Sequence, residues 1–175
     1  QYLSHNFHSF PAKFPPQLPR KFILGLTKKG DTVLDPMLGS GTTVVEAYLT
    51  GRQGIGFDID PLALLLSYVK VTPLQMEKVV KWGNVIIKQA EIKIEKKHKE
   101  LKSKLETYWD KKSKKFVDYW FAPSTQVELL ALINEIQKIE DESIRSFYKL
   151  IFSSIIITKT GGVSLAFDLA HTRPH

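Results

Sequence analysis

The sequence predicts an α/β protein in which a short parallel sheet is followed by a mostly helical region. Two observations support this fold class. A β-branched apolar run at residues 32–34 leads directly into a glycine-rich turn and a helical pattern, and a second short run follows at 54–57. Beyond Met76, apolar residues recur at steps of three or four. We therefore expect a sheet-containing part over residues 1–72, a helical region over 73–160 and a linker over 161–175.

Proline and glycine delimit the elements of the first region. The prolines within 8–16 predict an extended arm, because each disfavours helical angles in the residue before it. A helix should begin near Pro16 and end near Gly25 or Gly30. A buried strand is expected over 32–34, a helix through 44–49 that Gly51 stops, and a second strand over 54–57. A further helix should run from residue 61 and end before Pro73.

The helical region carries most of the excess positive charge. Its apolar pattern predicts one long amphipathic helix over 76–115, and residues 91–115 hold ten lysines against five acidic residues. Thr125 and Glu128 form a capping-box pattern at the start of the next helix. The apolar run 147–160 predicts a last helix, which the glycines at 161–162 should end.

Composition limits the possible functions. The formal charge of +7 favours an acidic partner such as nucleic acid, although a solvated lysine-rich surface would give the same charge. The absence of cysteine and the scattered histidines argue against a metal site. No run approaches the length of a membrane span, and there is no secretory leader, so a cytoplasmic location is expected. Because the chain begins at Gln1 and ends at His175 without a clear final element, we expect it to be part of a longer protein.

Chemistry is concentrated in the glycine-rich turn that follows the first strand. Gly39 and Gly41 allow a tight turn, and the amides at the start of the following helix can face a carboxylate. Asp35 can pair with an ammonium group, so this turn suits a zwitterion better than a pyrophosphate. Asp58 ends the second strand roughly 20 residues later, where an acid binds ribose hydroxyls in nucleoside-binding folds. S-adenosylmethionine satisfies both sites, whereas the spacing of a dinucleotide-binding motif and the lysine of a P-loop are missing.

These motifs also resemble a known family. Phe-Pro-Ala-Lys-Phe-Pro at 10–15, Asp-Pro-Met-Leu-Gly-Ser-Gly-Thr-Thr at 35–43 and Asp-Ile-Asp-Pro-Leu-Ala at 58–63 resemble the DNA methyltransferases that modify cytosine N4 or adenine N6. Over residues 8–70 the resemblance implies an incomplete Rossmann-like methyltransferase fold with a large helical insertion, acting on double-stranded DNA with S-adenosylmethionine as cofactor. The cofactor-binding residues that the turn and the resemblance together predict are Lys13, Phe14, Pro15, Asp35, Pro36, Gly39, Ser40, Gly41, Thr42, Thr43, Asp58 and Ile59.

One element of that family is missing. Its catalytic tetrapeptide is Asp, Asn or Ser followed by two prolines and an aromatic residue, whereas the only Pro-Pro pair here, at 15–16, is preceded by Phe14 and followed by Gln17. No catalytic residue is therefore predicted within this chain, and we expect the tetrapeptide beyond His175 or in a second chain. An RNA methyltransferase and a noncatalytic subunit that binds cofactor or nucleic acid remain alternatives.

Overall fold

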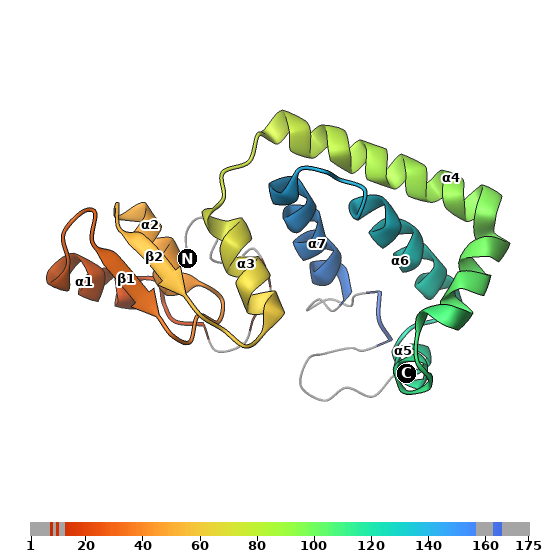
Figure 1. Cartoon of the computed structure of the whole chain (residues 1–175), viewed down its shortest axis with the longest axis horizontal. Helices are drawn as coiled ribbons and strands as arrows, with labels where there is room; N and C mark the ends of the chain where they lie inside the picture. Colours follow the sequence, from red (N-terminus) through yellow and green to blue (C-terminus); the bar gives the residue numbers. More distant parts are fainter. Residues whose placement is uncertain (1–7, 9, 11–12, 157–162, 166–175) are drawn as a thin grey trace. The chain divides into compact units, whose positions relative to one another are not determined.

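A computed structural model describes residues 8, 10, 13–156 and 163–165 (Figure 1). The chain divides into two compact units, Gln1–Pro73 and Leu74–His175. None of the helices in the described ranges combines the length and the apolar character needed to cross a membrane.

The first unit contains the expected parallel strand pair. Its elements are α1 (Gln17–Leu26), β1 (Thr32–Asp35), α2 (Thr42–Leu49), β2 (Gln53–Gly56) and α3 (Pro61–Val71) (Figure 1). β1 and β2 lie in parallel register, with Thr32 opposite Gln53 and Asp35 opposite Gly56. The predicted order of strand, helix and strand is confirmed, and the helices before and after it begin and end close to the expected prolines and glycines.

The sheet is less buried than the sequence indicates. α2 packs against both strands, and Val44 approaches Gly54 so closely that an added Cβ would lie 3.0 Å from the valine Cβ. Leu34 and Ile55, paired on the opposite face, are 58% and 46% exposed. The prediction of a buried strand was therefore wrong, because α2 covers one face and no other described element covers these two side chains.

The second unit is helical, and its first helix is shorter than predicted. The helices are α4 (Met76–Tyr108), α5 (Lys111–Trp120), α6 (Pro123–Ile136) and α7 (Glu142–Ile156). The single helix expected over 76–115 bends at Lys97, whose φ is −128°, and ends before Asp110. The Asp110 side chain accepts hydrogen bonds from the backbone N–H groups of Lys112 and Ser113 and so caps a separate helix.

The next two helices also begin earlier than their predicted signals. α6 starts at Pro123 with Ala122 as its N-cap, so Thr125 lies inside the helix and the predicted capping box is wrong. A proline in the first turn starts this helix without a side-chain cap. α7 starts at Glu142, where Asp141 accepts hydrogen bonds from the N–H groups of Ser143 and Ile144. The predicted end of that helix at residue 160 and the glycines at 161–162 lie outside the described residues.

Two apolar clusters join the helices of the second unit. α4 lies along α6 (Figure 1), and the first cluster is formed by buried residues of these two helices, Ala90, Leu101, Val127, Leu130 and Ala131. The second cluster links α4, the end of α6 and α7 through Ile86, Ile136, Ile139 and Ile144. The amphipathic pattern read from the sequence thus supplies this unit's core.

Candidate cofactor site

The turn between β1 and α2 adopts a backbone conformation that requires glycine. Gly39 and Gly41 have φ angles of 50° and 77°, in the left-handed region that favours glycine. A Cβ on Gly41 would also lie only 2.3 Å from the Oγ of Ser67 on α3. The two glycines therefore let the chain reverse tightly at the start of α2. Gly41 is the N-cap of that helix and supplies no capping side chain, so the first α2 amides have no partner within the helix.

Asp58 lies at the same edge of the sheet and connects the turn to β2. Its Oδ2 accepts a hydrogen bond of 2.7 Å from the Gly39 N–H, and its Oδ1 accepts one of 2.9 Å from the Asp60 N–H. Both glycine turn and acid follow parallel strands, whose carboxyl ends meet at one edge. The hydrogen bonds from the Asp60 and Gly39 amides hold the pKa of Asp58 below its ordinary value, so the carboxylate is ionised at neutral pH.

The remaining residues of the turn divide into buried hydroxyls and exposed groups. Ser40 and Thr42 are buried, and their hydroxyl oxygens lie 3.2 Å apart. Asp35, the last residue of β1, accepts a hydrogen bond from the Met37 N–H. Ile59 is fully exposed. The structure thus gathers most of the predicted polar residues around one turn, with Thr43 half-buried and Pro36 exposed beside them.

The arm before α1 also reaches the turn. A Cβ on Gly39 would lie 3.7 Å from the Phe10 ring, so this aromatic residue covers the turn, although it was not among the predicted site residues. Lys13 is half-buried and donates a hydrogen bond to the His8 carbonyl, whereas the Phe14 side chain is exposed. Pro15 accepts a hydrogen bond from the Leu18 N–H at the start of α1. The arm's residues 11 and 12 lie outside the described part of the chain.

Two residues of α3 at the turn were missed by the sequence reasoning. The Lys70 Nζ donates a hydrogen bond of 2.7 Å to the Ser40 carbonyl. Burial, and then the nearby charge of Lys13, lower the pKa of Lys70 to about 8. Ser67, one helical turn earlier, is buried, and its Oγ has no hydrogen-bond partner among the described residues. Their spacing of three residues within an apolar helix is a signal that could have identified them.

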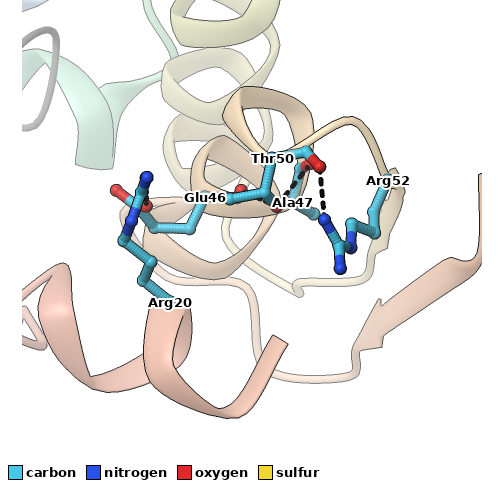
Figure 2. Close-up of polar contacts among 5 residues, drawn as sticks. All are labelled: Arg20, Glu46, Ala47, Thr50 and Arg52. Carbon is cyan, nitrogen blue, oxygen red and sulfur yellow. Dashed lines mark hydrogen bonds and ion pairs between the residues drawn. The ribbon is translucent and has the colours of Figure 1, made fainter. Parts of the chain in front are cut away.

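A separate polar network links α1, α2 and the start of β2. Figure 2 shows the side chain of Arg20 on α1 reaching Glu46 on α2, at 3.1 Å, and Thr50 bonding back to the Glu46 carbonyl. Arg52 donates to the Thr50 carbonyl (Figure 2) and to both oxygen atoms of Thr27. Glu46 is fully buried. These contacts hold α1, α2 and the start of β2 together and thereby position the turn.

Several known proteins are similar to this chain in sequence. A DNA methylase family model matches residues 1–68. The Type II methyltransferase M.MvaI of Kocuria varians is 29% identical over 161 residues, which cover 88% of this chain and 34% of that protein. M.MjaII of Methanocaldococcus jannaschii is 38% identical over 77 residues, covering 44% of this chain and 14% of that protein.

A shorter match is more similar. M.BglI of Bacillus subtilis is 52% identical over 56 residues, which cover 32% of this chain and 16% of that protein. No solved structure matches the chain. The chain thus spans about a third or less of the length of these relatives. The matched family model includes the glycine turn and Asp58, so residues 1–68 are similar to the DNA methylases.

Proposed function

We propose that this chain supplies the cofactor-binding part of an enzyme that transfers a methyl group from S-adenosylmethionine to an exocyclic amino group of cytosine (N4) or adenine (N6) in DNA. The observation that carries the proposal is the hydrogen bond between the Gly39 N–H and Asp58. It joins a glycine turn suited to an amino acid with an acid suited to a ribose, at one edge of a parallel strand pair.

The residues at this edge fit the chemical groups of that cofactor. The uncapped amides at the start of α2 suit a carboxylate, and Asp35 suits an ammonium group. Asp58 already accepts two backbone hydrogen bonds, yet its oxygens keep lone pairs for ribose hydroxyls. Lys13, Phe14 and Pro15 lie in the arm whose Phe10 covers Gly39. When bound, S-adenosylmethionine would supply an electrophilic methyl group.

The wider site residues extend the same proposal. Ser40, Thr42 and Thr43 would shape the turn around the amino-acid end, with Pro36 holding the backbone after Asp35. Ile59, fully exposed beside Asp58, would offer an apolar surface to the adenine ring. This chain's own contribution is binding and orientation, since the family's catalytic tetrapeptide does not occur in its sequence.

Further elements of a longer protein, or of a second chain, would complete the fold as a Rossmann-like sheet. The exposed face of Leu34 and Ile55 supports this inference, because parallel sheets are ordinarily covered on both faces. The short coverage of the relatives supports it independently. The missing part would carry the tetrapeptide and receive the base, which must be flipped out of the duplex to reach the methyl group.

The lysines of the helical unit support double-stranded DNA as the partner. Ion pairs engage Lys93, Lys97 and Lys114 with Glu135, Glu100 and Asp118, respectively. The described residues provide no such pair for Lys96, Lys99, Lys102, Lys104, Lys111, Lys112 and Lys115. Exposed ammonium groups of this kind bind phosphates by releasing counterions. DNA methylation would place the enzyme in the cytoplasm.

Calorimetric titration of the chain with S-adenosylmethionine and with S-adenosylhomocysteine tests the cofactor proposal. We expect saturable binding that Asp58→Ala weakens at least about tenfold, or about 1.4 kcal/mol. Asp31→Ala is the matched control, because Asp31 is an exposed acid of the same unit, and it should leave affinity unchanged. Failure of the folded chain to bind, or equal affinity in the Asp58 variant, would contradict the proposal.

A further inference from the structure

One side of the glycine turn holds polar groups that the proposed cofactor contacts leave unused. Ser67 and Lys70 project from the same face of α3, and Lys70 contacts the turn directly through the Ser40 carbonyl. Ser67 is 4% exposed, and its Oγ lies against Gly41 without a hydrogen-bond partner. Leaving a buried hydroxyl unsatisfied is costly, so this side of the turn has hydrogen-bonding capacity that the described residues do not fill.

Lys70 is also a half-buried cation close to another cation. Lys13, in the arm, is near enough for its charge to act on Lys70, and the two ammonium groups come from segments far apart in the sequence. None of the ion pairs among the described residues involves Lys70. Neighbouring cations disfavour each other's charge, and an anion placed between or beside them relieves that repulsion. With a pKa of about 8, Lys70 is still mostly protonated at neutral pH.

We propose that Lys70, together with Lys13, binds the carboxylate of the cofactor's amino-acid end and thereby selects ligands that carry this carboxylate. The inference rests on the proposed function and adds to it a residue of α3 that the glycine motif does not contain. The start of α2 would supply amides to the same anion, since Gly41 caps it without a side chain. Lys70 would thus do more than hold the Ser40 carbonyl in place.

A matched pair of ligands separates charge recognition from structural support. S-adenosylmethionine and its decarboxylated analogue share the nucleoside, the sulfonium and the ammonium group, and they differ in the carboxylate. We expect Lys70→Met to weaken binding of S-adenosylmethionine about tenfold and to change binding of the analogue less than twofold. Lys70→Arg, which keeps the charge, should retain most of the preference for the carboxylate. Lys21→Met, a loss of an exposed charge on α1, is the control and should change neither affinity.

The outcomes distinguish this inference from the proposed function. Equal weakening of both ligands by Lys70→Met in a folded protein would make Lys70 a structural support of the turn and overturn the inference alone. Unchanged binding of both ligands would overturn it too. If the folded wild-type chain bound neither ligand, the proposed function would fail and this inference with it. Circular dichroism and thermal unfolding of each variant establish that it is folded.

Discussion

The two units of the chain bury their apolar residues in different ways. In the second unit, α4, α6 and α7 enclose two clusters in which Ala131 and Ile139 have no exposed surface, and Leu150 on α7 is also fully buried. In the first unit, α2 covers one face of the strand pair, while Leu34 and Ile55 are exposed on the other. A long amphipathic helix needs one partner for its single apolar stripe, whereas a parallel sheet needs cover on two faces.

This difference suits the proposed division of labour. The first unit places its polar residues along one edge, around the glycine turn and Asp58, and leaves the sheet face of Leu34 and Ile55 exposed. The second unit closes its own core and carries the lysine-rich surface outside it. A folded chain should therefore show a self-sufficient helical unit beside a less stable strand–helix–strand unit.

The largest effect is expected from removing a core side chain of the second unit. Leu150→Ala should lower the free energy of unfolding by about 2–5 kcal/mol, because it leaves a cavity in place of a fully buried leucine. Urea unfolding followed by tryptophan fluorescence measures this free energy, since Trp82, Trp109 and Trp120 all lie in this unit. Leu34→Ala is the same change on the open sheet face. It should lower the free energy of unfolding by less than about 0.5 kcal/mol, measured by urea unfolding followed by circular dichroism. An equally large loss at Leu34 would mean that this face is covered in solution.

A smaller effect is expected from a methyl group in the glycine turn. Gly41→Ala should destabilise the first unit by roughly 1–3 kcal/mol, because alanine disfavours a φ of 77° and its Cβ would collide with Ser67. Adding Ser67→Gly should restore only the part of the lost stability that is due to the collision. Gly25→Ala is the matched control: nothing lies within 4 Å of its added Cβ on α1, so thermal unfolding should show a stabilisation of about 0.5–1 kcal/mol. Destabilisation by both substitutions alike would contradict the turn geometry.

A pH-dependent effect is expected at Glu135 in the second unit. Burial raises the pKa of this carboxyl, but the hydrogen bonds and charges of Lys138 and Lys93 outweigh it and hold the pKa below the ordinary 4.5. The folded state therefore binds the proton more weakly, and the stabilisation is present above about pH 4.5 and lost as pH falls through the folded pKa. Glu135→Gln should lower the free energy of unfolding by about 1–2 kcal/mol at pH 7. The loss is no larger because solvent screens the ion pairs with the partly exposed Lys93 and Lys138.

Urea unfolding between pH 7 and pH 3 measures this dependence. The difference between wild type and Glu135→Gln should shrink as the pH falls below 4.5. Glu140→Gln, at an exposed position in the same unit, should show no comparable difference at any pH. If the stability difference between wild type and Glu135→Gln stayed constant across this pH range, the ion pairs of Glu135 would not be its cause.

The smallest effect is expected where the long helical pattern is interrupted. Asp110→Ala removes the side chain that accepts hydrogen bonds from Lys112 and Ser113 and should speed hydrogen exchange of these two amides several-fold. The unfolding midpoint should change little, because α5 has no fully buried residue. Ser103→Ala, at an exposed position within α4, is the control. Unchanged exchange at Lys112 and Ser113 would mean that Asp110 does not determine where α5 begins.

Local signals predicted much of the fold. The strand, glycine turn, helix and second strand were recognisable because proline, glycine and β-branched residues act on the backbone near them. The capping box at Thr125 was wrong, since a proline two residues earlier starts the helix instead. The continuous helix over 76–115 was also wrong, because Asp110 caps a new helix although the apolar spacing continues across the break. The assignment of cofactor-binding roles to the turn residues stays a prediction.

The amino-acid sequence alone specifies the order of elements in the first unit and the similarity of residues 1–68 to the DNA methylases. Packing in three dimensions brings distant residues together there: Asp58 is bonded to Gly39, Ser67 lies against Gly41, and Lys70 contacts the turn through the Ser40 carbonyl. It also decided that Leu34 is exposed. A helix or strand forms largely because of the backbone preferences of its own residues. The contacts and exposure of its side chains depend instead on which other elements pack against it.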